Sequence, residues 1–234
     1  MNLQIISPIF PPEIGGPASY ISQLINHLPA SIKPSIVAFC QEAKPTKLIS
    51  NQTILRPSTN SLTRQLQLFS AIWKSSKPTT CFYLQGTIIV GLPTLIISKL
   101  RHKKIVIKFV GDEIWETARF FNKTRKSLES FYQHQPRQGL LLYLHRLILT
   151  TADTIVTPSK YLKNFLVTVH HLKPEKIVVI PNPISFPKIS PQYKQPYQLI
   201  YVGRLEAWKH IDLAIKHVIK ARKIKPWQLL IVGT

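Results

Sequence analysis

The chain has 234 residues, of which 44% are hydrophobic and 18% charged, and its 31 Lys and Arg against 10 Asp and Glu give a formal net charge of +21. This globular mixture excludes disordered, collagen-like and disulfide-scaffold proteins, and two cysteines are too few for a secreted framework. The charge favours anionic partners, namely phosphates, nucleotides, nucleic acid or an acidic membrane surface, although a solvated lysine-rich surface explains it equally well.

Short apolar runs alternate with longer amphipathic stretches over the first 180 residues. Strands are predicted at residues 3–6, 35–39, 80–84, 104–110, 154–157 and 176–180. Helices are predicted, from apolar residues at helical spacing, at residues 17–28, 62–73, 87–100, 140–150 and 161–169. Pro17 suits a first helical position, and Ser159 is expected to cap the helix that follows it. Strands separated by helices predict an α/β fold with right-handed crossovers and a parallel sheet.

A proline-rich stretch divides the chain. Five prolines lie between residues 181 and 196, which predicts a linker at 183–197 after a Rossmann-like domain of residues 1–182. A strand at 198–202, a helix at 211–223 and a strand at 228–232 then repeat the plan of the opening segment. A unit of about 37 residues buries too little for a core of its own. We therefore expect 198–234 to be the start of a second, incomplete Rossmann-like domain, and the chain to be truncated.

Three loops that follow strands carry suitable chemistry, because ligands of open parallel sheets bind beyond the carboxyl ends of the strands. Gly15 and Gly16 precede a helix, where backbone N–H groups can approach an anion or simply form a tight turn. Arg204 and Lys209 precede a later helix and suit phosphate oxygens, or belong to a basic surface loop. Residues 109–116 hold three of the ten acids, which could orient a sugar hydroxyl or cap a helix.

Five segments, in this order, resemble glycosyltransferase family 4, whose members have the GT-B fold of two Rossmann-like domains facing each other across a cleft. The segments are residues 11–16, 91–93 together with 108–116, 152–159, 180–183, and 202–205 with Lys209 following. The second of these is similar to one bacterial branch of the family. The resemblance covers the whole chain and implies an N-terminal acceptor domain followed by the start of a nucleotide-sugar domain.

The resemblance implies a retaining transfer of a sugar from a nucleotide-diphosphate sugar to a lipid- or polysaccharide-linked acceptor of the cell envelope. Four residues match the site for the donor diphosphate: Gly15, Gly16, Arg204 and Lys209. Asp112, at a loop where many members carry histidine, is the candidate catalytic residue, and the candidates on the acceptor side are Glu13, Glu113 and Ser159. No metal or other cofactor is expected. The glutamate pair with which the family binds the donor lies further on than Thr234, so we expect the chain to be inactive alone.

Two alternative functions remain open. The charge suits a nucleic-acid-binding protein, but neither a helix-turn-helix nor an RNA-recognition pattern is present, so nucleic acid is not the expected partner. The other alternative is a non-catalytic acceptor-binding subunit. The histidines at 134, 145, 170, 171 and 217 show no metal-ligand spacing with acids or cysteines, and His170 and His171 are expected to end a helix.

Basic residues between Arg119 and Arg146 are interleaved with aromatic and leucine side chains. This pattern suits peripheral contact with an anionic membrane, or a solvated helix face over ordinary core. The opening residues lack the basic region of a secretory signal, and no apolar stretch reaches the roughly 18 residues of a membrane span. We therefore expect a cytoplasmic protein, peripheral at the inner face of the membrane.

Overall fold

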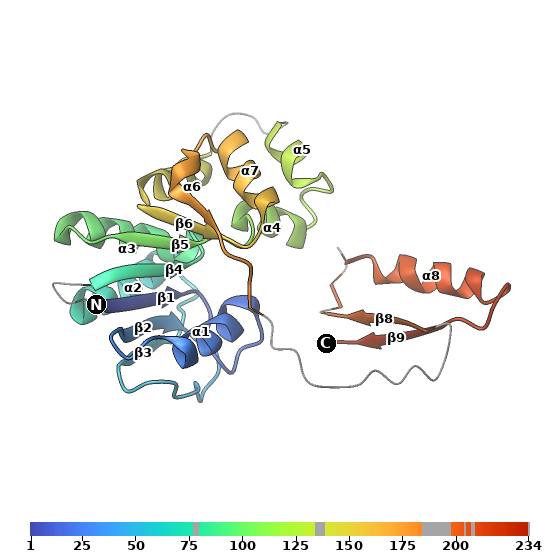
Figure 1. Ribbon diagram of the computed structural model, residues 1–234, viewed down its shortest axis with the longest axis horizontal. Helices are drawn as coiled ribbons and strands as arrows, with labels where there is room; N and C mark the ends of the chain where they lie inside the picture. Colours follow the sequence, from blue (N-terminus) through green and yellow to red (C-terminus); the bar gives the residue numbers. More distant parts are fainter. Residues whose placement is uncertain (77–79, 134–138, 184–197, 204, 207–208, 234) are drawn as a thin grey trace. The chain divides into compact units, whose positions relative to one another are not determined.

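The computed structural model describes residues 1–76, 80–133, 139–183, 198–203, 205–206 and 209–233, in two compact units (Figure 1). Unit 1 is Met1–Asn182, and unit 2 is Pro183–Thr234. Residues 184–197 of the predicted linker and Arg204 lie outside the described residues.

Unit 1 is built on a parallel sheet with the strand order β3-β2-β1-β4-β5-β6-β7. The strands are β1 (Asn2–Ser7), β2 (Lys33–Phe39), β3 (Gln52–Leu55), β4 (Thr80–Gln85), β5 (Ile105–Lys108), β6 (Thr154–Thr157) and β7 (Ile177–Val179). The predicted α/β class and parallel sheet are confirmed. The strand order reverses beside β1, which pairs with β2 on one side and β4 on the other. The prediction missed β3, because its four residues are half polar.

The connections between the strands are mostly helical. The helices are α1 (Gly16–His27), α2 (Ser61–Ser75), α3 (Ile88–Arg101), α4 (Glu113–Phe120), α5 (Leu128–Gln133), α6 (Leu140–Thr151), α7 (Lys160–Thr168) and the 3-10 helix η1 (Pro174–Lys176). Pro17 stands in the first turn of α1, as predicted. The predicted cap of α7 is also confirmed, since Leu162 N donates to the Ser159 hydroxyl at 3.2 Å. Helices α4 and α5 were not predicted as elements.

Pro93 lies inside α3, where it has no N–H to donate to the carbonyl of Ile89 four residues earlier. The side-chain amide of Gln65, on α2, donates to that carbonyl oxygen instead, at 3.0 Å. The hydrogen bond that proline removes is therefore replaced by a contact between neighbouring helices, which explains how α3 continues past Pro93.

Apolar side chains gather in two clusters in unit 1. The larger one joins the sheet to α2, α3, α6 and α7, and includes Leu68, Ile97 and Phe165. The smaller one lies under α1 and joins Ile21 to Ile5 and Ile36 of the first two strands. Burial on both sides explains why the strands read as continuous apolar runs in the sequence.

Unit 2 consists of β8 (Gln198–Val202), α8 (Ile211–Ala221) and β9 (Gln228–Val232), with β8 parallel to β9. Ile200 and Val202 remain 64% and 70% exposed. A parallel strand pair normally has both faces covered. In the part of the chain that the structure describes, no helix is long and apolar enough to cross a bilayer.

Candidate functional site

A pocket of about 340 Å³ opens at the carboxyl ends of β1, β4 and β5. Its walls come from the loops that follow these strands and from the first turns of α1, α3 and α4. The lining residues are Pro8, Ile9, Pro17, Gln85, Gly86, Ile88, Ile89, Lys108, Phe109, Val110, Gly111, Glu113, Glu116 and Thr117. The pocket thus lies where the strand order reverses, which is where open parallel sheets bind their ligands.

Lys108 gives this pocket a buried positive charge. Its side chain leaves β5 and is 1% exposed, with Nζ 3.3 Å from the carbonyl oxygen of Ile180 and 4.9 Å from the centre of the Tyr20 ring. Burial lowers the pKa of Lys108. Among the described residues, no carboxylate forms an ion pair with this ammonium group. An anionic ligand group in the pocket would supply the missing countercharge.

The two glycines predicted to bind phosphate lie at the N-terminus of α1, next to the pocket. Gly15 is the N-cap and Gly16 the first helical residue. In this described helix, no acid stands in the first turn and no side chain caps the N–H groups. A Cβ added at Gly16 would meet no atom within 4 Å, so packing within the protein does not require glycine there.

Glu113 holds the loop after β4 against the start of α4. Its carboxylate accepts hydrogen bonds from the backbone N–H groups of Thr87, at 2.5 Å, and Ile88, at 2.8 Å, which begin α3. Burial raises the pKa of Glu113, and the two N–H groups oppose that shift. Gly86 has φ +108°, and a Cβ there would collide with the Glu113 carboxylate. Glu113 therefore caps α3 and fixes one wall of the pocket.

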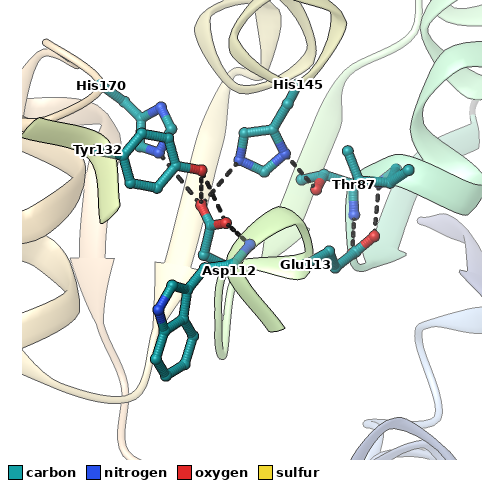
Figure 2. Close-up of polar contacts among 8 residues, drawn as sticks. Thr87, Asp112, Glu113, Tyr132, His145 and His170 are labelled. Atoms are coloured by element: carbon teal, nitrogen blue, oxygen red, sulfur yellow. Dashed lines mark hydrogen bonds and ion pairs between the residues drawn. The ribbon is translucent and has the colours of Figure 1, made fainter. Parts of the chain in front are cut away.

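Asp112, beside this wall, lies at the centre of a buried cluster, defined here as Asp112, Tyr132, His145 and His170 (Figure 2). The Asp112 carboxylate accepts a hydrogen bond from Trp115 N at 2.8 Å, and this bond caps α4. It also accepts a hydrogen bond from the Tyr132 hydroxyl, which lies 2.8 Å from both carboxylate oxygens. Nε2 of His145 and Nε2 of His170 lie 3.5 and 3.4 Å from Asp112 Oδ2. The ligand-type atoms of the acid and the two histidines lie within 4.8 Å of one another.

The cluster shifts the pKa values of its members. Burial raises the pKa of Asp112, but the imidazoles of His145 and His170 lower it by more. The pKa of this carboxyl therefore lies well below its usual range. Burial lowers the pKa of His170, and the Asp112 carboxylate opposes that shift. Burial raises the pKa of Tyr132, and the adjacent Asp112 raises it further. The Asp112 carboxylate is thus a buried negative charge beside two imidazoles.

The acidic and serine site residues predicted in unit 1 all accept hydrogen bonds from backbone N–H groups. The side chain of Asp112, the candidate catalytic residue, is enclosed in the cluster, and its carboxylate caps α4. Of the two interpretations of residues 109–116, helix capping is the one that the structure confirms. The Glu13 carboxylate accepts a hydrogen bond from Gln41 N, which connects the loop after β1 to the residues that follow β2. The Ser159 hydroxyl caps α7.

The second half of the predicted donor site lies in unit 2. Lys209, whose backbone N donates to Glu206 O at 2.9 Å, precedes α8, whereas Arg204 is not among the described residues. The sequence prediction missed three residues that the fold brings to this region: Lys108, His145 and His170. Two signals were available. Lys108 is a charge inside a β-branched run, and His145 lies three and four residues before Ile148 and Leu149, on the buried side of α6.

The sequence model of the protein family Glycosyltransferase Family 4 matches residues 117–186 of the chain. Among curated protein sequences, none matches. The chain is similar in structure to the lipopolysaccharide outer core galactosyltransferase WaaB in its apo form, with 17% identity and a TM-score of 0.59 over 99% of this chain and 60% of that one.

Two further solved structures are similar. UDP-GlcNAc 2-epimerase from Neisseria meningitidis bound to UDP-GlcNAc is 14% identical with a TM-score of 0.56, over 99% of this chain and 65% of that one. A glycosyltransferase from Rickettsia africae is 14% identical with a TM-score of 0.53, over 99% of this chain and 60% of that one. The resemblance to family 4 is confirmed over residues 117–186, and the α/β, GT-B-like fold class is confirmed. The chain spans 60–65% of the length of these three structures.

Proposed function

We propose that the chain is part of a retaining glycosyltransferase that moves a sugar from a nucleotide-diphosphate sugar to a lipid- or glycan-linked acceptor of the cell envelope. The family match and the fold support glycosyl transfer at the coarser level. The observation that carries the finer proposal is the pocket at the sheet switch point, beside the uncapped N-terminus of α1 and containing the buried ammonium group of Lys108.

In this proposal, the pocket takes the acceptor. Its lining is mainly apolar, with Ile9, Ile89 and Phe109 among its side chains, and Lys108 supplies one positive charge at the base. An acceptor that joins an anionic group to an apolar portion matches both features. Its anionic group would pair with the Lys108 ammonium, and its apolar portion would contact the apolar lining.

The donor diphosphate would meet the N–H groups at Gly15 and Gly16. Negative charge develops on the diphosphate as the bond to the sugar breaks, and helix N-termini and cationic side chains stabilise such charge. Arg204 and Lys209 are the proposed cations from unit 2. No metal ion is required for this electrostatic role, so we propose a metal-independent transfer.

The experiment is a titration of the chain with a panel of nucleoside-diphosphate sugars, using Gly16→Ala as the test variant and Gly139→Ala as the control. Both added methyl groups would meet no atom within 4 Å. Gly16→Ala is expected to leave the free energy of unfolding within about 1 kcal/mol and to weaken binding about tenfold, because the methyl group keeps the phosphates from the backbone. Equal binding by both variants, or no binding by the unmodified chain, would contradict the proposed donor site.

The acceptor half is tested with a phosphate-linked alkyl glycoside and its uncharged counterpart. Lys108→Met is expected to weaken binding of the first by about tenfold and to leave the second unchanged. Sugar transfer to either compound is then measured with the donor that binds. Because we expect the chain to be inactive alone, any transfer would further support the proposal, whereas acceptor binding without donor binding would favour the alternative of a non-catalytic acceptor-binding subunit.

We also propose peripheral contact with anionic membranes through the end of α4. Phe120 and Phe121 are 58% and 60% exposed, next to the basic side chains of Arg119 and Lys123. The sequence pattern between Arg119 and Arg146 that predicted this surface also includes Phe131 and Arg137. Phe131 is instead buried, and Arg137 lies outside the described residues. Replacing Phe120 and Phe121 by serine should reduce co-sedimentation with phosphatidylglycerol vesicles, while phosphatidylcholine vesicles bind neither form.

A further inference from the structure

The buried cluster contains more unsatisfied ring nitrogens than a buried site normally tolerates. Asp112, His145 and His170 are 1%, 0% and 3% exposed. Among the described residues, neither Nε2 of His145 nor either ring nitrogen of His170 has a hydrogen-bond partner. A buried polar atom without a partner destabilises a protein, because it has lost its hydrogen bonds to water without replacement. Two of these three atoms, the Nε2 atoms of His145 and His170, face one oxygen of the Asp112 carboxylate, which indicates that another group completes the cluster.

The distances within the cluster match those between two ligands of one metal ion. Both imidazoles point at the same carboxylate oxygen (Figure 2), with Nε2 of His145 3.5 Å and Nε2 of His170 3.4 Å from Asp112 Oδ2. An N–H···O hydrogen bond is shorter, at about 2.7–3.2 Å. Two ligand atoms that each lie about 2.0–2.2 Å from a tetrahedral ion are about 3.3–3.6 Å apart.

We propose that Asp112, His145 and His170 bind a divalent transition-metal ion of the zinc type, through Oδ2 and the two Nε2 atoms. Two imidazoles and one carboxylate suit Zn²⁺, whereas Mg²⁺ and Ca²⁺ take mainly oxygen ligands. The Tyr132 hydroxyl donates a hydrogen bond to Oδ2 at 2.8 Å and helps to orient the carboxylate. The proposed sugar transfer does not use His145 or His170, and the family resemblance assigns no metal ion to Asp112.

The groups around the three ligands already orient them. Thr87 Oγ1 lies 2.9 Å from Nδ1 of His145, and a hydrogen bond from Nδ1–H would leave the Nε2 lone pair directed at the carboxylate. Trp115 N fixes Asp112 through its other oxygen, Oδ1. The rings of Tyr132 and Phe165 each stand 5.2 Å from the ring of His170. The binding geometry is thus largely formed by the protein itself.

The position of the site indicates a structural ion. The three ligand side chains are enclosed, so no substrate meets the ion, and they come from the cap of α4, the middle of α6 and the turn after α7. Helix α4 also carries Glu113 and Glu116, which line the pocket. A bound ion would therefore hold the wall of the pocket to the rest of unit 1.

The test uses the full chain after removal of metals with EDTA. Addition of Zn²⁺ is expected to give one equivalent per chain by elemental analysis and to raise the thermal midpoint by roughly 5–11 °C at a free concentration about 100 times the Kd. Addition of Co²⁺ is expected to produce the visible absorption bands of a four-coordinate site. A chain that binds less than one equivalent of either ion, with no change in midpoint, would overturn the proposal.

Variants at position 170 separate metal binding from packing. His170→Ser and His170→Cys remove the same imidazole, but the cysteine thiolate is itself a zinc ligand. We expect the Zn²⁺-dependent rise in midpoint to disappear in His170→Ser and to persist in His170→Cys. His171→Asn is the control, because His171 is exposed and asparagine accepts its φ of +56°. If His170→Ser responds to Zn²⁺ as the unmodified chain does, the ion binds elsewhere and the assignment is wrong.

Discussion

Tyr132→Phe tests whether the hydrogen bonding of the buried cluster supports the fold. The substitution removes one hydroxyl group, which lies 2.8 Å from both oxygens of Asp112, and leaves the ring in place. A hydrogen bond to a charged group contributes about 1.5–3 kcal/mol, and no cavity adds to that loss because the ring still packs against Phe165. For a chain of this size, the expected fall in thermal midpoint is roughly 3–12 °C.

The measurement is urea and thermal unfolding followed by circular dichroism, with EDTA present so that a bound metal does not contribute. Tyr143→Phe is the matched control, since Tyr143 is 58% exposed on α6. That variant should stay within about 0.5 kcal/mol of the unmodified chain. If the two variants lose the same free energy of unfolding, Asp112 does not depend on the Tyr132 hydroxyl, and the reasoning about the cluster fails.

Three further substitutions test the pocket and its supports by urea unfolding. Gly86→Ala is expected to destabilise the chain by about 1–3 kcal/mol, because φ is +108° and the methyl group collides with Glu113; a neutral result would contradict the described loop. Gly91→Ala places a methyl group 2.8 Å from Ile148. The cost of overpacking, about 1–3 kcal/mol, should outweigh the gain of about 1 kcal/mol in helix propensity, so the variant should be less stable. A stabilised variant would show that α3 and α6 are further apart than described. Because burial lowers the pKa of Lys108, the native chain binds fewer protons than the unfolded one. Stability should therefore rise as the pH approaches the ordinary lysine pKa of 10.5, and this rise should be reduced in Lys108→Met. An unchanged slope would mean that Lys108 is solvated.

Sequence patterns located the elements whose signals are local. The strand at 154–157 was predicted with its observed bounds, and α1 and α7 to within one residue at each end. Pro17 and Ser159 act within one turn of their own helix, so their neighbours in sequence are also their partners in space. Helices α4 and α5 lacked that kind of signal. The acids of residues 109–116 suit either a cap or a ligand, and only the orientation of Asp112 separates the two.

The contents of the site were decided by tertiary structure. Strand order places β4 beside β1, although residues 8–79 separate them, and so brings Gly86, Gly111 and the α1 N-terminus to one pocket. His145 and His170 meet Asp112 from positions 33 and 58 residues away along the chain, with no spacing that a sequence pattern could register. The composition and the apolar periodicity of the chain determine that it forms an α/β sheet protein. Long-range packing determines which polar groups are enclosed together, because the burial of distant apolar faces, and not local hydrogen bonding, selects their partners.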